Sequence, residues 1–233
     1  MKKTEIIPAV LPKTFEELRE KLNKIKKAYD VLEIEHRVVQ IDVCEATLNK
    51  SFDLFRKEIE ELRDKTIDFE IELDFITKDF KTSIDEWIDL GVQRVIIHYA
   101  NLKPWNIFPW IFKFNKFVKK NSDKIEIGLG INLETPLNKI LPYLKKVKFV
   151  QFMGIKNIGH QGQIFDVVVL EKIKELRKIN SEIIVSVDGG INLDNAQSVI
   201  MAGANRLVIG SAILNENSSV EEIVRNIKSF NNF

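Results

Sequence analysis

Short apolar runs alternate with longer amphipathic stretches along almost the whole chain. Runs of strand length predict β-strands, and apolar residues spaced three and four apart predict helices. The predicted strands are residues 6–10, 36–43, 67–76, 92–98, 125–130, 147–153, 183–187 and 206–209. The predicted helices are about residues 14–28, 51–63, 82–91, 105–120, 165–178, 193–201 and 220–230, with one more opening at Thr135-Pro136.

This regular alternation of strand and helix predicts the fold class. Strands separated by helices pair in parallel, with the helices outside the sheet. Eight such units in 233 residues favour a TIM (β/α)₈ barrel formed as one domain by residues 1–233. A doubly wound open α/β sheet is the alternative. No linker, low-complexity segment or block of charge divides the sequence.

Composition narrows the class of protein further. The chain is 45% hydrophobic and 30% charged, as is usual for a soluble globular protein, and its net charge of +1 offers no general attraction to nucleic acid or anionic membrane. One cysteine, Cys44, excludes an intrachain disulfide and fits a reducing cytoplasm. The first residues resemble neither a signal peptide nor a membrane span, because Pro8 and Pro12 interrupt their short apolar run.

Glycine turns follow the last two predicted strands. Gly189-Gly190 comes after Asp188, and Gly210-Ser211 comes after residues 206–209. Glycine lets the backbone approach an anion, and a helix that follows directs free N–H groups at it. Many (β/α)₈ barrels bind phosphate after strands seven and eight. The two turns together predict a phosphate site, whereas one alone would indicate an ordinary turn.

Three carboxylates fall at the ends of otherwise apolar strands: Asp42, Asp74 and Asp188. In a parallel barrel these ends meet at the face that holds the active site. A buried carboxylate is costly unless it is paired or bound to a cation, and three together repel one another. A divalent metal or retained protons would relieve that repulsion. The alternative is that each acid only caps the loop that follows it.

Segments spread over nearly the whole chain resemble the ribulose-phosphate 3-epimerase family. They are IIPAVLPKTFEEL, VVQIDV, GLGINLETPLNKI, FVQFMGIKNIGHQGQIFD and VDGGINLDNAQSVIMAGANRLVIGSAI, in that order, and the similarity is weaker between about residues 46 and 124. The resemblance implies an isomerase with a ribulose-phosphate-binding barrel. Such an enzyme interconverts ribulose 5-phosphate and xylulose 5-phosphate by exchanging the proton at C3 through an enediolate.

The resemblance also implies roles for individual residues. Asp42 and Asp188 match the family's acid and base, which act on opposite faces of the sugar. Inverting a carbon next to a carbonyl needs such a pair, each tuned by its surroundings. Met153 matches a methionine that lines the site. The residues that match the phosphate grip are Gly162, Gly189, Gly190, Gly210 and Ser211.

The chain departs from the family at the metal site. The family uses the two aspartates and two histidines, whose places are taken here by Gln40 and Asp74. Oxygen ligands favour Mg²⁺ or Mn²⁺ over Zn²⁺. We therefore expect Asp42, Asp74, Asp188 and Gln40 to form a hard-cation site, or no metal to be bound. Without a metal, His98 at the end of the fourth strand is the candidate electrophile in contact with substrate, and a structural core histidine is the alternative.

Two further candidates and two rival functions remain. His160, in the segment IGHQGQ, could contact phosphate or cover the substrate, and Cys44 is expected to be a buried, inert thiol. The same barrel could instead be a phosphosugar isomerase or aldol-type lyase, or a phosphometabolite-binding protein without activity. The candidate acid and base, Asp42 and Asp188, favour an enzyme, because a protein that only binds its ligand needs no such groups on both faces of it. Its expected partners are a phosphorylated sugar and, because the family usually oligomerises, further copies of itself.

Overall fold

A computed structural model describes residues 3–43, 69–76, 88–89, 91–102, 107–160 and 162–233, with side chains omitted at 101–102 and 107–113. The strands in these residues are parallel and form a closed barrel in chain order, β1 pairing with both β2 and β8. The strands are β1 Glu5–Val10, β2 Val38–Val43, β3 Glu70–Phe75, β4 Arg94–His98, β5 Glu126–Ile131, β6 Phe149–Met153, β7 Ile184–Asp188 and β8 Arg206–Ile209. Closure confirms the (β/α)₈ barrel and excludes the open sheet.

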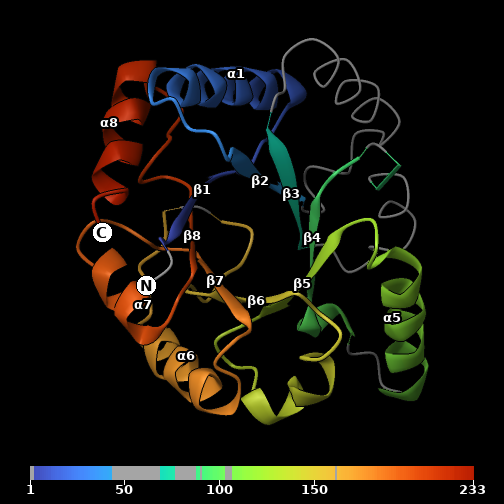
Figure 1. Cartoon of the computed structure of the whole chain (residues 1–233). Coiled ribbons are helices and arrows are strands. Elements are labelled where there is room, and N and C mark those ends of the chain that lie inside the picture. The colour runs from blue at the N-terminus through green and yellow to red at the C-terminus, as the bar shows by residue number, and fades with distance from the viewer. Residues whose placement is uncertain (1–2, 44–68, 77–87, 90, 103–106, 161) are drawn as a thin grey trace.

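Helices surround the strands on the outside (Figure 1). They are α1 Phe15–Val31, α5 Ile107–Asn121, α6 Val168–Ile179, α7 Ala196–Ala202 and α8 Val220–Phe230, with 3₁₀ turns η1 Tyr99–Leu102, η2 Leu137–Lys139 and η3 Leu141–Tyr143. The helix predicted at 51–63, most of the one predicted at 82–91, and Cys44 lie outside the described residues. Among the helices that are described, none is long and apolar enough to span a membrane.

The helix predicted to open at Thr135-Pro136 is wrong. Two 3₁₀ turns, η2 and η3, occupy this connection instead. Pro142 lies inside η3 and has no N–H to donate to Asn138, and its ring would collide with the preceding turn of an α-helix. A continuous helix through this stretch would therefore be broken at its second turn.

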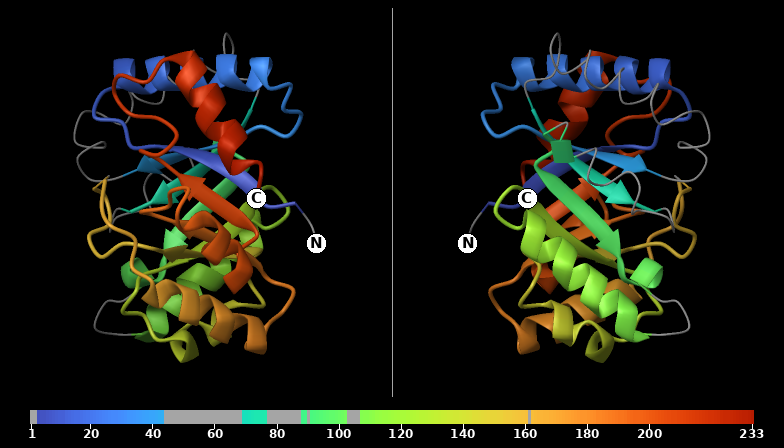
Figure 2. Two further views of the ribbon diagram at one scale, coloured as in Figure 1. Left: turned by 90° about the vertical axis from the view of Figure 1, so that its left-hand side faces the viewer. Right: turned by 90° about the vertical axis from the view of Figure 1, so that its right-hand side faces the viewer.

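The helices α1 and α8 pack side by side where the barrel closes (Figure 2). Their N-termini carry the capping signals expected of helix starts. The Thr14 hydroxyl accepts a hydrogen bond from the backbone N–H of Glu17 at 3.1 Å, and Ser219 forms a complete capping box with Glu222. Each helix also buries one apolar face against the rest of the barrel.

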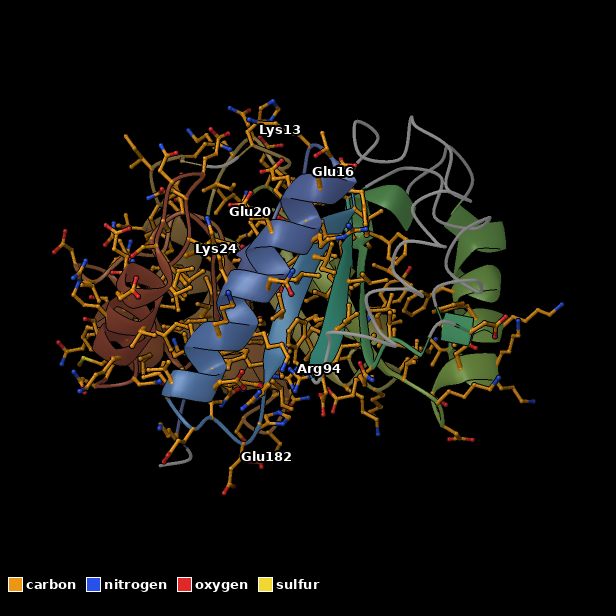
Figure 3. The ribbon with its side chains drawn as sticks, turned by 90° about the horizontal axis from the view of Figure 1, so that it is seen from above. Lys13, Glu16, Glu20, Lys24, Arg94 and Glu182 are labelled. Atoms are coloured by element: carbon orange, nitrogen blue, oxygen red, sulfur yellow. The ribbon has the colours of Figure 1, made fainter. Side chains whose placement is uncertain are left out.

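Charged and polar side chains occupy much of the inside of the barrel. In β3, Ile71, Leu73 and Phe75 pack in the core between strands and helices, so the alternate residues Glu72 and Asp74 point inward. At the N-terminal end of the barrel, charged side chains from five strands form an ionic cluster: Glu5, Glu72, Arg94, Glu126 and Arg206. Figure 3 shows Arg94 at the opposite end of the barrel from Lys13, which follows β1.

The buried Glu72 makes stability depend on pH. Burial raises its pKa from 4.5 to about 7. The folded protein therefore holds a proton that the unfolded chain releases between these values, and the free energy of unfolding falls as pH rises from about 5 to about 7. We expect Glu72→Gln to remove this pH dependence. The free energy of unfolding of the variant, compared with that of wild type, should therefore be higher at pH 8 than at pH 5. Urea unfolding of both proteins at pH 5 and pH 8 measures this difference in stability. A difference that is the same at both pH values would contradict the prediction.

Candidate active site

Three aspartates converge at the C-terminal end of the barrel. Asp42 and Asp74 are directly paired on the neighbouring strands β2 and β3, and Asp188 ends β7. Each offers a carboxylate oxygen within 4.8 Å of the oxygens of the other two. Asp74 is fully buried, while Asp42 and Asp188 are 9% and 8% exposed. Exposure at the rim leaves Asp42 and Asp188 accessible to a bound molecule.

Two buried glutamine amides bridge these carboxylates. Gln40 Nε2 donates to Asp42 Oδ1 at 2.8 Å and to Asp188 Oδ2 at 3.1 Å. Gln151 Nε2 lies 3.2 Å from Asp74 Oδ2 and 3.5 Å from Asp188 Oδ2. Gln151 was not among the predicted site residues, although its place two residues before Met153 on β6 puts it on the same inward face. Each amide thus reduces repulsion between two acids.

His98 lies against Asp74 inside the barrel. Its Nε2 is 2.6 Å from Asp74 Oδ1, and both side chains are buried. Burial lowers the pKa of His98 by disfavouring the charged ring, but the charge of the Asp74 carboxylate and its hydrogen bond raise the pKa by more. The pKa of His98 is therefore raised above its ordinary value. The ring fits because residue 130 is glycine, where an added Cβ would lie 2.9 Å from it. The pair therefore acts as a hydrogen-bonded unit.

Asp188 has the properties of an acid or base that works near neutral pH. Burial, followed by the charge of Asp74, raises its pKa to about 7. Hydrogen bonds from Gln40 and from the backbone N–H of Gly189, together with the charge of His98, act in the opposite direction. A carboxyl with this pKa can both accept and release a proton at the pH of the cell.

A solvent-open cavity joins the carboxylates to the glycine turns. Asp42, Asp188 and Met153 line one part of it. The predicted phosphate-binding residues also line it: Gly162, Gly189, Gly190, Gly210 and Ser211. Asp74, Gln40 and His98 are not among the lining residues. The cavity thus presents two carboxyl groups and two backbone turns to one ligand.

The turn at Gly189-Gly190 requires glycine. Both residues have positive φ, +99° and +72°, which side chains rarely allow. A Cβ on Gly190 would also lie 2.7 Å from the backbone of Phe165. These constraints fix the path of the backbone along the cavity wall.

Each glycine turn is separated by further turns from the helix that follows it, α7 or α8. After Gly190, Asn195 Nδ2 donates to the Gly190 carbonyl at 3.0 Å in a turn that delays α7 until Ala196. After β8, the N–H groups of Ile213 and Leu214 both donate to the Gly210 carbonyl at 3.0 Å, and α8 begins at Val220. Any anion here would be held by N–H groups of the turns and the Ser211 hydroxyl, without a helix terminus.

The aspartate cluster could hold a divalent metal ion. Its three carboxylates supply converging oxygen atoms, and Gln40 Oε1 is buried without a hydrogen-bond partner among the described residues. An unpartnered buried amide oxygen is costly, and rotation of the amide would offer it to a cation. The residues present therefore fit a hard cation that prefers oxygen ligands.

Comparison with known proteins assigns the family. The model of the ribulose-phosphate 3 epimerase family matches residues 5–214. The chain belongs to this family. Ribulose-phosphate 3-epimerases from Buchnera aphidicola (strain APS) and Serratia marcescens are 28% and 26% identical to it, over 91% and 93% of this chain and 89% and 98% of theirs. Membership in the epimerase family, with these relatives, makes the chain a phosphosugar epimerase.

Solved structures agree on the fold. A structure of KGPDC from Streptococcus mutans superposes with a TM-score of 0.69 at 16% identity, over 99% of this chain and 97% of that one. A 3-hexulose-6-phosphate synthase gives a TM-score of 0.67 at 16% identity, over 95% of this chain and 99% of that one. At such low identity these likenesses support the barrel fold alone.

Proposed function

We propose that the protein interconverts ribulose 5-phosphate and xylulose 5-phosphate by exchanging the proton at C3 through an enediolate. The single observation that carries this proposal is the cavity itself. It presents two carboxyl groups, Asp42 and Asp188, and two glycine turns to the same ligand. Membership of the epimerase family supports the reaction class.

Asp42 and Asp188 act as the acid and base. They come from β2 and β7, which are separated in the barrel by β1 and β8, so they approach a bound sugar from different directions. One takes the proton from C3, and the other delivers a proton to the opposite face. The pKa of Asp188, about 7, suits either role. Without an ion, Gln40 donates to both carboxylates and fixes their spacing.

The negative charge of the enediolate needs stabilisation. Asp42, Asp74, Asp188 and Gln40 would hold a divalent cation, and Mg²⁺ or Mn²⁺ suits these oxygen donors better than Zn²⁺. When bound, such an ion would offset charge on the enediolate oxygens. His98 contacts Asp74 rather than the cavity, so we assign it to orient the Asp74 carboxylate.

The phosphate group occupies the other end of the cavity. The turns at Gly189-Gly190 and Gly210-Ser211 offer backbone N–H groups, and Gly162 lines the facing loop. Backbone N–H groups gathered in turns bind anions well. Met153, which is buried beside Asp188 on the paired strand β6, forms the apolar wall for the sugar carbons.

Proton NMR in D₂O with a panel of phosphorylated ketoses tests the reaction. We expect ribulose 5-phosphate to give xylulose 5-phosphate with deuterium at C3, faster with Mg²⁺ or Mn²⁺ than with Zn²⁺ added to EDTA-treated protein. Products of C–C cleavage would instead identify a lyase. Binding without exchange or turnover under every metal condition would identify a phosphometabolite-binding barrel.

We also propose a cytoplasmic homo-oligomer. The single cysteine fits a reducing compartment, and the resemblance to an oligomeric family supports self-association. Light scattering coupled to size-exclusion chromatography gives the oligomeric state directly.

A further inference from the structure

The loop after β6 forms a compact turn at the rim of the cavity. The Gln163 side chain closes it, because its Oε1 accepts from the N–H of Asn157 at 3.1 Å and its Nε2 donates to the carbonyl of His160 at 2.8 Å and to that of Asn157. Gly159 and Gly162 flank His160 with φ of +86° and +75°. This geometry places His160 on the lining of the cavity with the glycine turns.

We propose that His160 binds the phosphate group of the substrate and sets the affinity of the site for it. The inference rests on the proposed function, which places phosphate at the glycine turns. His160 would donate a hydrogen bond from its ring N–H to a phosphate oxygen, strengthened by charge when the ring is protonated. It would act on binding and take no part in proton exchange at C3.

The charges around the cavity carry this inference. Its two ionisable acids, Asp42 and Asp188, lie in the same cavity that must accept a dianionic phosphate. Among the described residues that line it there is no lysine or arginine, and His160 is the one side chain that can carry positive charge. Backbone N–H groups supply only partial charges. His160 is therefore the described lining side chain that can bring a hydrogen-bond donor able to carry positive charge to the phosphate end.

The position of His160 separates its role from the chemistry. It lies on a loop and is exposed, whereas Asp42 and Asp188 end buried strands. A ligand can therefore reach the ring without any movement of the barrel. Loss of the ring should weaken binding of the phosphorylated end while leaving the geometry at C3 intact.

Three variants test the proposal: His160→Ala, His160→Lys and, as a control, His36→Ala. His36 is also exposed, but it pairs with Glu5 at the opposite end of the barrel. The measurements are the Kd of inorganic phosphate by calorimetry, and KM and kcat with ribulose 5-phosphate. We expect His160→Ala to raise Kd and KM by about tenfold, with kcat within about threefold of wild type. His160→Lys should recover most of the affinity, and His36→Ala should change neither constant.

Each other outcome has a definite meaning. If His160→Ala binds phosphate and ribulose 5-phosphate as wild type does, the inference is overturned while the proposed function stands. If His160→Lys binds as weakly as His160→Ala, the charge-based contact is overturned. If wild type turns over no pentulose phosphate but binds inorganic phosphate in a manner that depends on His160, the proposed function fails and this inference holds. A wild type that binds no phosphate overturns both.

Discussion

Asp188→Asn should lower epimerase turnover by about a thousandfold, within the range that one general acid or base contributes. Asparagine keeps the shape of the side chain but cannot exchange a proton, so one face of the sugar loses its catalyst. Gln40 can still donate to the amide oxygen, since it donates to Asp188 Oδ2 in wild type. The loss of rate should therefore report the chemistry and leave the fold unchanged.

Deuterium exchange sharpens this test. With Asp188 replaced, Asp42 can still remove and return the C3 proton on its own face. Exchange in D₂O should survive for one of the two epimers and be lost for the other, while interconversion stops. Asp194→Asn is the matched control, because Asp194 is exposed in the loop that follows and does not line the cavity. Full turnover by Asp188→Asn, or equal exchange of both epimers, would refute the assignment of two opposed groups.

The sequence predicted the barrel because its signals are local. Each strand is a short apolar run, and closure follows from the number and alternation of the elements. The aspartates could be chosen for the same reason, since each ends such a run and parallel strands end at one face. Where the prediction failed, at residues 135–144, the cause was also local: Pro142 could have been read as a helix breaker.

The contacts inside the barrel could not be predicted in this way. Whether Gln151 reaches Asp74 depends on β3 and β6, which are not neighbours and whose relative height is set by the stagger of the closed barrel. The pairing of His98 with Asp74 depends on space that a glycine on a third strand provides. A one-dimensional pattern gives the face on which each side chain lies, but not its partner across the barrel.

The ionic cluster at the N-terminal end of the barrel yields the largest expected effect on stability. Arg94→Met should lower the free energy of unfolding by about 3–5 kcal/mol, the usual cost of removing one partner from a buried charge pair. The side chain of Arg94 is 5% exposed, and its guanidinium lies 3.0 Å from Glu5 and 3.7 Å from the fully buried Glu72. Methionine fills similar space but leaves these carboxylates without that cation.

Guanidinium unfolding of Arg94→Met and of Arg225→Met measures the difference between a buried and an exposed arginine. Arg225 is 69% exposed and forms a long ion pair of 4.0 Å with Glu222. Its substitution should therefore lower the free energy of unfolding by less than about 0.5 kcal/mol. Equal losses in the two variants would show that the interior cluster does not contribute to stability as proposed.

A second substitution identifies which charge is responsible. Arg94 lowers the pKa of Glu72, against the larger opposite effect of burial, so its removal should leave Glu72 as the most costly charge in the barrel. Adding Glu72→Gln to Arg94→Met removes that charge while keeping the shape of the side chain, and should restore part of the lost stability at pH 8. At pH 5, where Glu72 already carries a proton, the same addition should restore much less. Recovery that is identical at both pH values would assign the instability to lost packing of the arginine, because packing does not titrate.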